Sequence, residues 1–254
     1  MKPYIAYYKK YKIIPTIKIN SKNYDTIIGQ RDNLYNQLKL DHKLFLNSDV
    51  LEVGPGSGYN AYYLIKKGIN KITLVEGNDT SVKKINQTLK KVKKNKYKII
   101  EEDFYKVKLN KKFDFVICEN VLSGVRNPKL FVKRLSSFVK KNGYLIINCS
   151  DSISLFSEKL RGVISSILLH EKKLVNNFNA KTNFLSKIFI SHLKSLNKNT
   201  RNISDWVQDV LLYEYWWRKK KYFSINEFIN VVKKKFVFFS SSPFCFTNYS
   251  WYKS

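Results

Sequence analysis

Apolar positions follow two different patterns along the chain, and the change between them falls near residue 150. Before it, short runs of consecutive apolar residues alternate with segments in which apolar residues recur at helical spacing. The short runs predict buried strands over residues 50–53, 72–75, 98–100, 113–118 and 144–148. The intervening segments predict helices after residue 58 and over 81–92 and 127–140. Strands that alternate with helices of this length form a parallel sheet covered on both faces, so the pattern predicts a doubly wound α/β core.

After residue 150 the strand signal stops for about 70 residues, and three segments at helical spacing follow, over 153–168, 185–196 and 204–217. We interpret them as a helical cap over the ligand end of the sheet. A last helix through residue 235 and two last strands, 236–239 and 248–252, would complete a mostly parallel seven-stranded sheet. The expected organisation is a single domain whose parts are an N-terminal helical segment, the core, the cap inserted after strand five, and the final helix with two strands: 1–45, 46–150, 151–222 and 223–254.

The overall composition is that of a globular protein, with 44% hydrophobic and 26% charged residues among 254. No apolar run approaches the roughly 18 to 20 residues of a membrane-spanning helix. The first ten residues carry charge too early for the apolar stretch of a secretory signal. The three cysteines, Cys118, Cys149 and Cys245, are too widely spaced for a disulfide framework or a metal clamp. We therefore expect a cytoplasmic protein without a bound metal.

The formal net charge is +28, yet it says little about a partner. Of the 47 basic residues only six are arginines, namely Arg31, Arg126, Arg134, Arg161, Arg201 and Arg218. Proteins that read guanine or grip phosphate with two hydrogen bonds favour arginine, whose planar fork fits those groups. Abundant Lys, Asn, Ile and Tyr together are what an AT-rich coding sequence produces. The charge is compatible with an anionic substrate and does not indicate a nucleic acid.

The strongest chemical signal is Glu52-Val-Gly54-Pro-Gly56-Ser-Gly58, at the end of the first predicted strand. Three of the nine glycines of the chain fall within the five positions 54–58. A glycine-rich turn between a strand and a helix lets the main chain approach a ligand closely. A dinucleotide site would need its third glycine at the position of Tyr59, and no phosphate-binding loop of the G-x-x-x-x-G-K-[ST] type is present.

At these residues the sequence resembles the class I S-adenosylmethionine-dependent methyltransferases, whose first motif, acidic-x-G-x-G-x-G, matches Glu52 to Gly58 without gaps. The resemblance implies S-adenosylmethionine as cofactor. It implies that the ligand borders the first strand's end and the start of the next helix, at Glu52, Gly54, Pro55, Gly56, Ser57, Gly58, Tyr59 and Asn60. It also implies that Glu76 accepts the two ribose hydroxyls, and that the main chain of Gly77 and Asn78 lies against the adenosine.

Further positions of the family pattern follow the third and fourth strands. Asp103 would accept the adenine amine and Phe104 would pack beside it, with Glu102 as the alternative in register and the protein core as the alternative for the ring. Glu119 and Asn120 would line the methyl-transfer site. The Asn/Asp-Pro-Pro-aromatic motif of amino-directed enzymes and a catalytic cysteine pair are both missing, and we interpret Cys118 as a core residue.

Other candidate residues lie outside the α/β core. Arg31 would reach the methionine carboxylate of the cofactor, or else be a surface arginine. In the cap, His170 is a weak candidate for a base, since the histidines form no metal or triad arrangement. Asp205, Gln208 and Asp209 share a helical face, and with Trp206 and Arg218 they would select the acceptor. Alternatively, the tryptophans of this region, which include Trp216 and Trp217, anchor the cap.

The resulting hypothesis is methyl transfer by in-line displacement, to oxygen or nitrogen of a small-molecule or carbohydrate acceptor, in a capped pocket. An RNA methyltransferase is the first alternative. It would require lysines beside the pocket mouth, for which the candidates are Lys83, Lys84, Lys90, Lys91, Lys93 and Lys94. A non-catalytic scaffold that binds the cofactor or a partner is the second.

Overall fold

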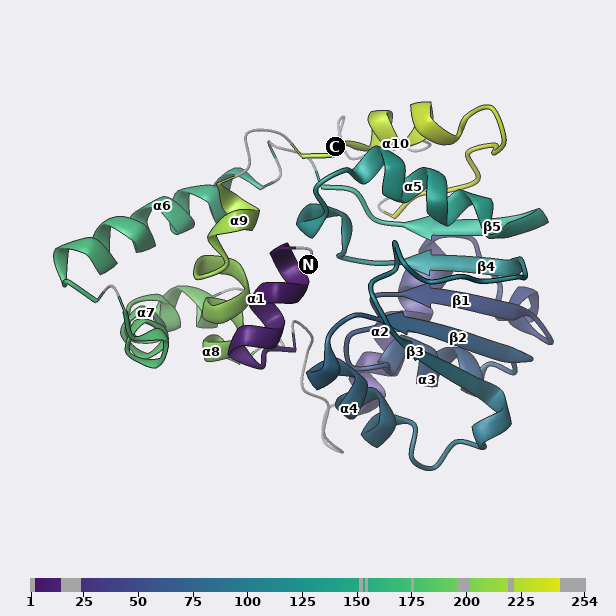
Figure 1. Cartoon of the computed structure of the whole chain (residues 1–254), viewed down its shortest axis with the longest axis horizontal. Coiled ribbons are helices and arrows are strands. Elements are labelled where there is room, and N and C mark those ends of the chain that lie inside the picture. The colour runs from purple at the N-terminus through teal and green to yellow at the C-terminus, as the bar shows by residue number, and fades with distance from the viewer. Residues whose placement is uncertain are drawn as a thin grey trace.

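The computed structural model describes residues 3–14, 24–150, 153, 155–174, 176–195, 202–218 and 222–242. Its centre is a sheet of five parallel strands in the order β3-β2-β1-β4-β5 (Figure 1). The strands are β1 (Asp49–Val53), β2 (Lys71–Glu76), β3 (Tyr97–Glu101), β4 (Phe113–Cys118) and β5 (Val139–Ile147). The predicted doubly wound α/β core is therefore confirmed.

The direction of winding reverses between β1 and β4. From β1 the chain builds outward through β2 to β3, and then returns to place β4 on the other side of β1. In open parallel sheets the crevice at the carboxyl ends of the strands beside such a reversal is the usual ligand site. The ends of β1, β2 and β4 are the places where the sequence positions Glu52, Glu76 and Glu119.

Each face of the sheet has its own hydrophobic core, because side chains alternate along a strand. Leu51 and Val53 of β1 pack in the cluster that includes α5 (Pro128–Ser137) and α10 (Ile225–Val232). Val50 packs in the opposite cluster, which includes residues of α2 (Tyr24–Gln37), α3 (Tyr59–Lys66) and α4 (Asp79–Thr88). The first cysteine, Cys118, is completely buried, as predicted.

The prediction of seven strands is wrong for the part of the chain that the structure describes, where the sheet has five. Residues 236–239 form no strand: Val237 is 93% exposed, and Phe236 packs against the core beside α10. The other expected strand, 248–252, lies outside the described residues. The boundary between α5 and β5 also differs, because β5 begins at Val139 and contains Asn142 in the left-handed region, at φ 61°.

The cap follows β5 and lies beyond the carboxyl ends of the strands (Figure 1). It consists of α6 (Phe156–Glu171), α7 (Phe178–Ser195), α8 (Ile203–Trp206), a π-helical turn η4 (Val207–Leu211) and α9 (Glu214–Trp217). Its helices pack around a separate hydrophobic cluster. The expected continuous helix over 204–217 is thus divided into three short elements.

The first helix, α1 (Pro3–Tyr11), lies between the cap and the core (Figure 1). On its cap side the Tyr7 hydroxyl donates to the Gln208 carbonyl at 2.6 Å, and the Tyr8 hydroxyl donates to Asp209 Oδ1 at 2.8 Å. On its core side Ile5 lies against Gly77 and Tyr4 against Gly124. The helix therefore joins the two parts of the molecule across the carboxyl edge of the sheet.

None of the described helices combines the length and the apolar character of a membrane span.

Candidate functional site

The turn after β1 has a backbone conformation that favours glycine at each of three positions. Gly54, Gly56 and Gly58 have φ values of 73°, 58° and 79°, in the left-handed region. The Gly54 N–H donates to the Val75 carbonyl at 2.9 Å, which fixes the start of the turn against β2. A Cβ atom on Gly54 would lie 2.4 Å from Val121 Cγ2. The turn therefore brings bare main chain close to the segment that follows β4. Pro55 and Ser57 complete the turn and are buried.

Glu76, the last residue of β2, joins this turn to the start of α4. Its Oε2 accepts from the Gly56 N–H at 3.2 Å, and its Oε1 accepts from the Asn78 N–H at 2.9 Å. Asn78 is the N-cap of α4, and its Nδ2 donates to the Ile13 carbonyl at 2.8 Å. A carboxylate has about four acceptor positions, and the Gly77 N–H is a third main-chain donor to Glu76, so this carboxylate retains capacity for a further hydroxyl donor.

Glu52, near the end of β1, has a hydrogen bond to only one of its two carboxylate oxygens. Its Oε1 accepts from Asn60 Nδ2 at 3.1 Å, and Asn60 Oδ1 in turn accepts from the Tyr35 hydroxyl at 2.8 Å. Its Oε2 is buried and has no hydrogen-bond partner. A buried carboxylate oxygen without a donor is costly, and a cationic ligand would satisfy it. S-adenosylmethionine carries a sulfonium and an amino group, so the residues present fit this cofactor.

Burial raises the pKa of the carboxyl groups of both Glu52 and Glu76. Desolvation raises the pKa of Glu52 to about 7, although the hydrogen bond from Asn60 opposes this shift. Desolvation also raises the pKa of Glu76 to about 7, against the main-chain donors of Asn78, Gly56 and Gly77. Both values lie above the ordinary 4.5, so the folded protein holds these protons more tightly than the unfolded chain. Their contribution to stability is present below about pH 4.5 and is lost as the pH rises through about 7.

The same shifts predict a pH-dependent affinity for S-adenosylmethionine. A cationic ligand binds the ionised carboxylates better, so its affinity should rise roughly tenfold between pH 6 and 8. Titration calorimetry across this range measures the effect. In Glu52→Gln the rise should become smaller, whereas Glu101→Gln, at an exposed position on the neighbouring β3, should leave it unchanged. An affinity that does not change with pH in the unmodified protein would contradict the assignment.

Arg31 and Glu119 form an ion pair at the end of β4. Arg31 Nη1 lies 2.8 Å from both carboxylate oxygens of Glu119, and the two side chains are only 25% and 20% exposed. Desolvation lowers the pKa of Arg31, but Glu119 outweighs it and the net change is upward. Arg31 is therefore a partly buried, paired cation at the edge of the site, and not a freely solvated surface arginine.

Asn120 follows Glu119 with a left-handed φ of 58° and pairs with the end of β5. Its N–H donates to Asn148 Oδ1 at 2.5 Å, and its Oδ1 accepts from Asn148 Nδ2 at 2.7 Å. This reciprocal pair fixes the exposed chain beyond β4 and brings Asn148 to the site.

The two residues predicted to contact the adenine, Asp103 and Phe104, have different surroundings in the segment after β3. Asp103 is half-buried, its Oδ1 accepts from the Tyr105 N–H at 3.1 Å, and its charge helps to raise the pKa of Tyr4 after desolvation. Phe104 is 2% exposed and packs edge to face against Phe131, so its ring belongs to the core. Glu102 is exposed and its Oε1 accepts from the Asp103 N–H. Asp103 remains beside the site, while ring stacking by Phe104 is excluded by its burial.

The cap residues singled out from the sequence hold the cap together and hold α1 in place. Gln208 and Asp209 bind the tyrosines of α1, and Trp206 is buried in the cap cluster beside Phe189. The π-helical turn breaks the regular spacing on which the shared face of Asp205, Gln208 and Asp209 depended.

The structure does not support the expected roles of two more cap residues, Arg218 and His170. Arg218 is paired with Glu214 at 3.1 Å. His170 is exposed in the last turn of α6, at the end of that helix that points away from the sheet, so the geometry does not support its role as base (Figure 1). Trp217 does anchor the cap: it packs on Gly162 and its Nε1 donates to the Leu211 carbonyl at 2.8 Å.

Sequence reasoning missed the part that α1 has in the site. Ile5 is 4% exposed, and a Cβ atom on Gly77 would lie 2.6 Å from its Cδ1. Tyr4 lies against Gly124, in the turn that follows Glu119 and Asn120. The recurrence of apolar residues at Ile5 and Tyr8 was the available signal, but it does not show where the helix docks.

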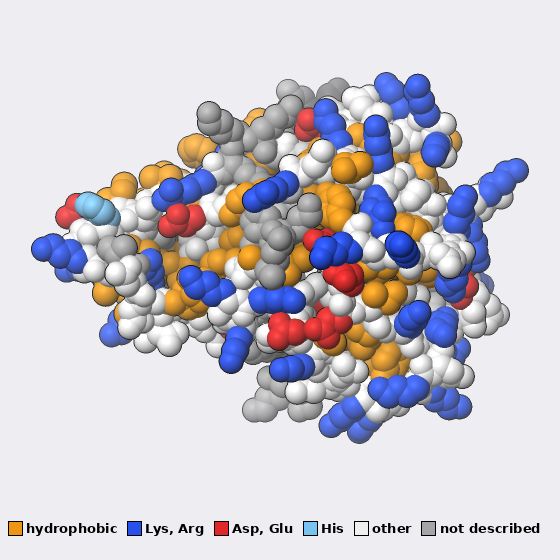
Figure 2. All heavy atoms as spheres, viewed as in Figure 1, with side chains coloured by type: hydrophobic (Ala, Val, Ile, Leu, Met, Phe, Trp, Pro, Cys, Tyr) orange, Lys and Arg blue, Asp and Glu red, His pale blue; other side chains and the backbone are white. Residues whose placement is uncertain are grey.

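The charge around this edge differs from that of the rest of the surface. Figure 2 shows acidic side chains gathered where the cap meets the core, on a face otherwise dominated by lysine and arginine. Glu52, Glu76 and Glu119 lie at the ends of three neighbouring strands with Arg31 as their basic neighbour. The residues at this edge are thus mostly acidic, which suits a positively charged small molecule.

Comparison with known protein families agrees with this geometry. Residues 51–147 match the model of a family described as a methyltransferase domain. The α/β core therefore matches a methyltransferase domain, and the resemblance to the class I S-adenosylmethionine-dependent methyltransferases found in the sequence is confirmed.

Individual proteins with similar sequences are methyltransferases by name. The mitochondrial ubiquinone biosynthesis O-methyltransferase of Dictyostelium discoideum is 25% identical over 134 residues, which cover 48% of this chain and 42% of that protein. The ubiquinone biosynthesis O-methyltransferase of Rickettsia canadensis (strain McKiel) is 31% identical over 102 residues, 39% of this chain and 42% of that protein. The chain thus matches less than half the length of either relative.

Among solved structures, one that matches is the N-methyltransferase NodS of Bradyrhizobium japonicum WM9 in complex with S-adenosyl-L-homocysteine. It is 15% identical, with a TM-score of 0.44, and the match covers 50% of this chain and 65% of that one.

Proposed function

We propose that this protein transfers a methyl group from S-adenosylmethionine to a small-molecule acceptor bound between the core and the cap. The observation that carries the proposal is the unpartnered, buried Oε2 of Glu52 beside a turn of three left-handed glycines. The methyltransferase domain match over residues 51–147 supports the same reaction class.

In this proposal the chain binds and orients the cofactor with groups from three strand ends. Glu52 faces its cationic part, Glu76 accepts from its ribose hydroxyls, and Asp103 accepts from its adenine amine. Arg31 is shared between Glu119 and the cofactor carboxylate. When bound, the cofactor supplies an electrophilic methyl group on sulfur, and the transfer needs mainly alignment and exclusion of water.

The remaining groups would act on the acceptor. Glu119 and Asn120 border the place where the acceptor would meet the methyl group. If the acceptor is a hydroxyl, Glu119 is the carboxylate placed to take its proton. The cap and α1 would exclude water from the edge of the sheet. The names of the two curated relatives support O-methylation of a small molecule.

The position of the lysines disfavours the RNA alternative. Lys90, Lys91, Lys93 and Lys94 precede β3, whose carboxyl end lies at the site edge. In a parallel sheet these residues therefore lie at the opposite end of the strands, and not beside the site. Lys83 and Lys84 lie on α4, and alone they do not make a continuous basic stripe.

The test is transfer of label from methyl-labelled S-adenosylmethionine to fractionated cell extract. We expect label in the small-molecule fraction with the unmodified protein and none with Glu76→Ala. Label in RNA would establish the alternative acceptor. If cofactor binds but label enters no fraction, the non-catalytic scaffold is the correct reading.

A further inference from the structure

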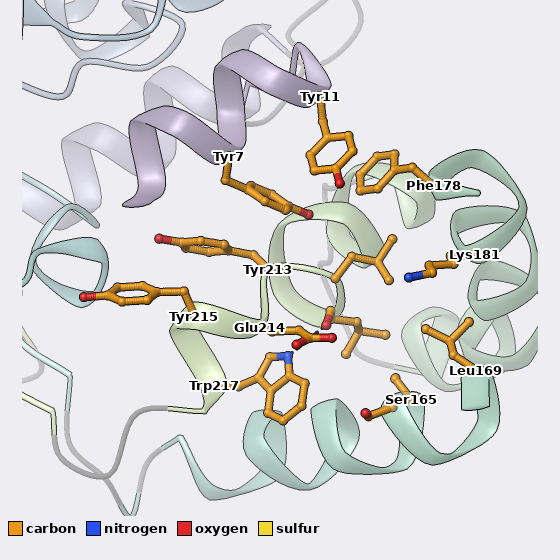
Figure 3. Close-up of a pocket in the computed structure, with 13 residues that line it drawn as sticks. Tyr7, Tyr11, Ser165, Leu169, Phe178, Lys181, Tyr213, Glu214, Tyr215 and Trp217 are labelled. Carbon is orange, nitrogen blue, oxygen red and sulfur yellow. Dashed lines mark hydrogen bonds between the residues drawn. The ribbon is translucent and has the colours of Figure 1, made fainter. Parts of the chain in front are cut away.

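The cap contains a cavity of about 340 Å³ to which the proposed function assigns no ligand. It lies between α1, α6, α7 and the segment around α9 (Figure 3). Its volume is within the range of small-molecule sites and about twice that of a cavity known to hold one benzene ring. A substituted six-membered ring would fit.

Aromatic side chains form much of the wall. Tyr11 of α1 stacks on Phe178 of α7, with ring centroids 3.8 Å apart. Tyr7 lies beside Tyr213, with centroids 4.7 Å apart, and Trp217 closes the side next to α6 (Figure 3). Such walls favour a planar aromatic ligand, which can contact ring faces and edges.

Two of the residues that line the cavity, Ser165 and Tyr213, have a buried hydroxyl without a hydrogen-bond partner. Ser165 is 1% exposed, and its Oγ is unpartnered. Tyr213 is 4% exposed, and its hydroxyl is also unpartnered. Figure 3 shows Ser165 on the α6 side of the cavity, while the Tyr213 hydroxyl points toward the side of the α/β core. Buried polar groups without a partner are uncommon, and a ligand with a hydroxyl would satisfy the one on α6.

The charged side chains that line the cavity indicate whether its ligand is cationic, anionic or uncharged. The cavity is lined by one basic residue, Lys181, and one acidic residue, Glu214, which is paired with Arg218. These charges do not leave a net negative wall for a cationic amine, nor a cluster of basic groups for an acid. An uncharged ring with a hydroxyl is the class that this lining fits best.

We propose that this cavity binds a hydroxylated aromatic ring of the phenol class. As the acceptor site, this proposal rests on the function proposed above. The connection is α9, which lines the cavity and contacts η3 (Leu122–Gly124), the turn that follows Glu119 and Asn120. The cavity and the segment that borders the methyl-transfer site are thus in contact with the same short helix, α9.

Three probes of similar size test the chemistry. Phenol should bind to the full chain with a dissociation constant in the millimolar range, measured by chemical-shift titration. Cyclohexanol keeps the hydroxyl and lacks the aromatic ring, and toluene keeps the ring and lacks the hydroxyl. Each should bind at least about fivefold more weakly. Equal affinity of all three, or no phenol binding up to about 20 mM, would overturn the proposal.

A pair of serine variants locates the site. Ser165→Ala should weaken phenol binding about tenfold and leave toluene binding unchanged. The matched control is Ser186→Ala on α7, which also removes a buried, unpartnered hydroxyl but does not line the cavity. Equal losses in both variants, or no loss in Ser165→Ala, would overturn the assignment of the site.

Cofactor binding separates this inference from the proposed function. S-adenosylhomocysteine is titrated into the same proteins. If it binds and phenol does not, the cavity proposal fails and the methyltransferase proposal stands. If phenol binds with the expected serine dependence and S-adenosylhomocysteine does not, the cavity stands as a ligand site and its role as acceptor site fails.

Discussion

Replacing Glu76 with alanine should lower the affinity for S-adenosylhomocysteine by about 30-fold or more. Hydrogen bonds to a charged group contribute about 1.5–3 kcal/mol each, and the variant loses those to the ribose. It also loses the acceptor that aligns the Gly56 and Asn78 N–H groups. Titration calorimetry measures the change, and circular dichroism shows whether the fold is retained.

Glu101 is the matched control for this experiment. It is the register partner of Glu76 on the neighbouring β3, ends the same edge of the sheet, and is exposed. Glu101→Ala removes the same charge and should change the affinity less than twofold. Glu76→Gln keeps one acceptor oxygen and should lie between the two. If Glu76→Ala binds as tightly as the unmodified protein, the ribose assignment is wrong.

Replacing Gly54 with alanine should destabilise the protein by about 2–5 kcal/mol and abolish cofactor binding. A left-handed conformation costs an L residue about 1–2 kcal/mol, and overpacking commonly costs another 1–3 kcal/mol. Both apply here, since φ is 73° and the new Cβ would lie 2.4 Å from Val121 Cγ2. Urea denaturation measures the loss of stability, and titration of the folded variant measures the loss of binding.

One control variant and one double variant show why Gly54→Ala loses stability. Gly29→Ala should stabilise the protein by about 0.5–1 kcal/mol, because Gly29 lies within α2 and a Cβ atom there meets nothing within 4 Å. Adding Val121→Ala to Gly54→Ala should recover the part of the loss that comes from the clash, and leave the part that comes from φ. A Gly54→Ala protein as stable as the unmodified one would contradict the tight turn.

The sheet and the glycine turn could be predicted because both depend on local sequence. Apolar runs such as 72–75 are too short for helices and are bounded by glycine or polar residues, which leaves a buried strand as their interpretation. The strand ends then place Glu52 and Glu76 on one edge without any knowledge of long-range contacts, because all strands of a parallel sheet point the same way. The match to a methyltransferase domain covers this same region.

The errors arose where distant contacts determine the outcome. Phe104 follows a strand, as a base-stacking residue would. Its ring nevertheless packs against Phe131 of α5, and it is therefore buried in the core. Asp205 and Asp209 have helical spacing, but a π-helical turn intervenes. The docking of α1 depends on Tyr7 and Tyr8 finding partners some 200 positions later in the chain. No local pattern contains that information.

The most direct test of cofactor binding at the carboxyl ends of the strands is a titration of isotope-labelled protein with S-adenosylhomocysteine, followed through the backbone amide signals of the protein. Saturable shifts should be concentrated in the turn after β1, at Gly77 and Asn78 after β2, and around Asp103 after β3. Signals from the far ends of α6 and α7 should stay in place. Saturable binding that moves only cap signals, or no shifts at all in the folded protein, would contradict cofactor binding there.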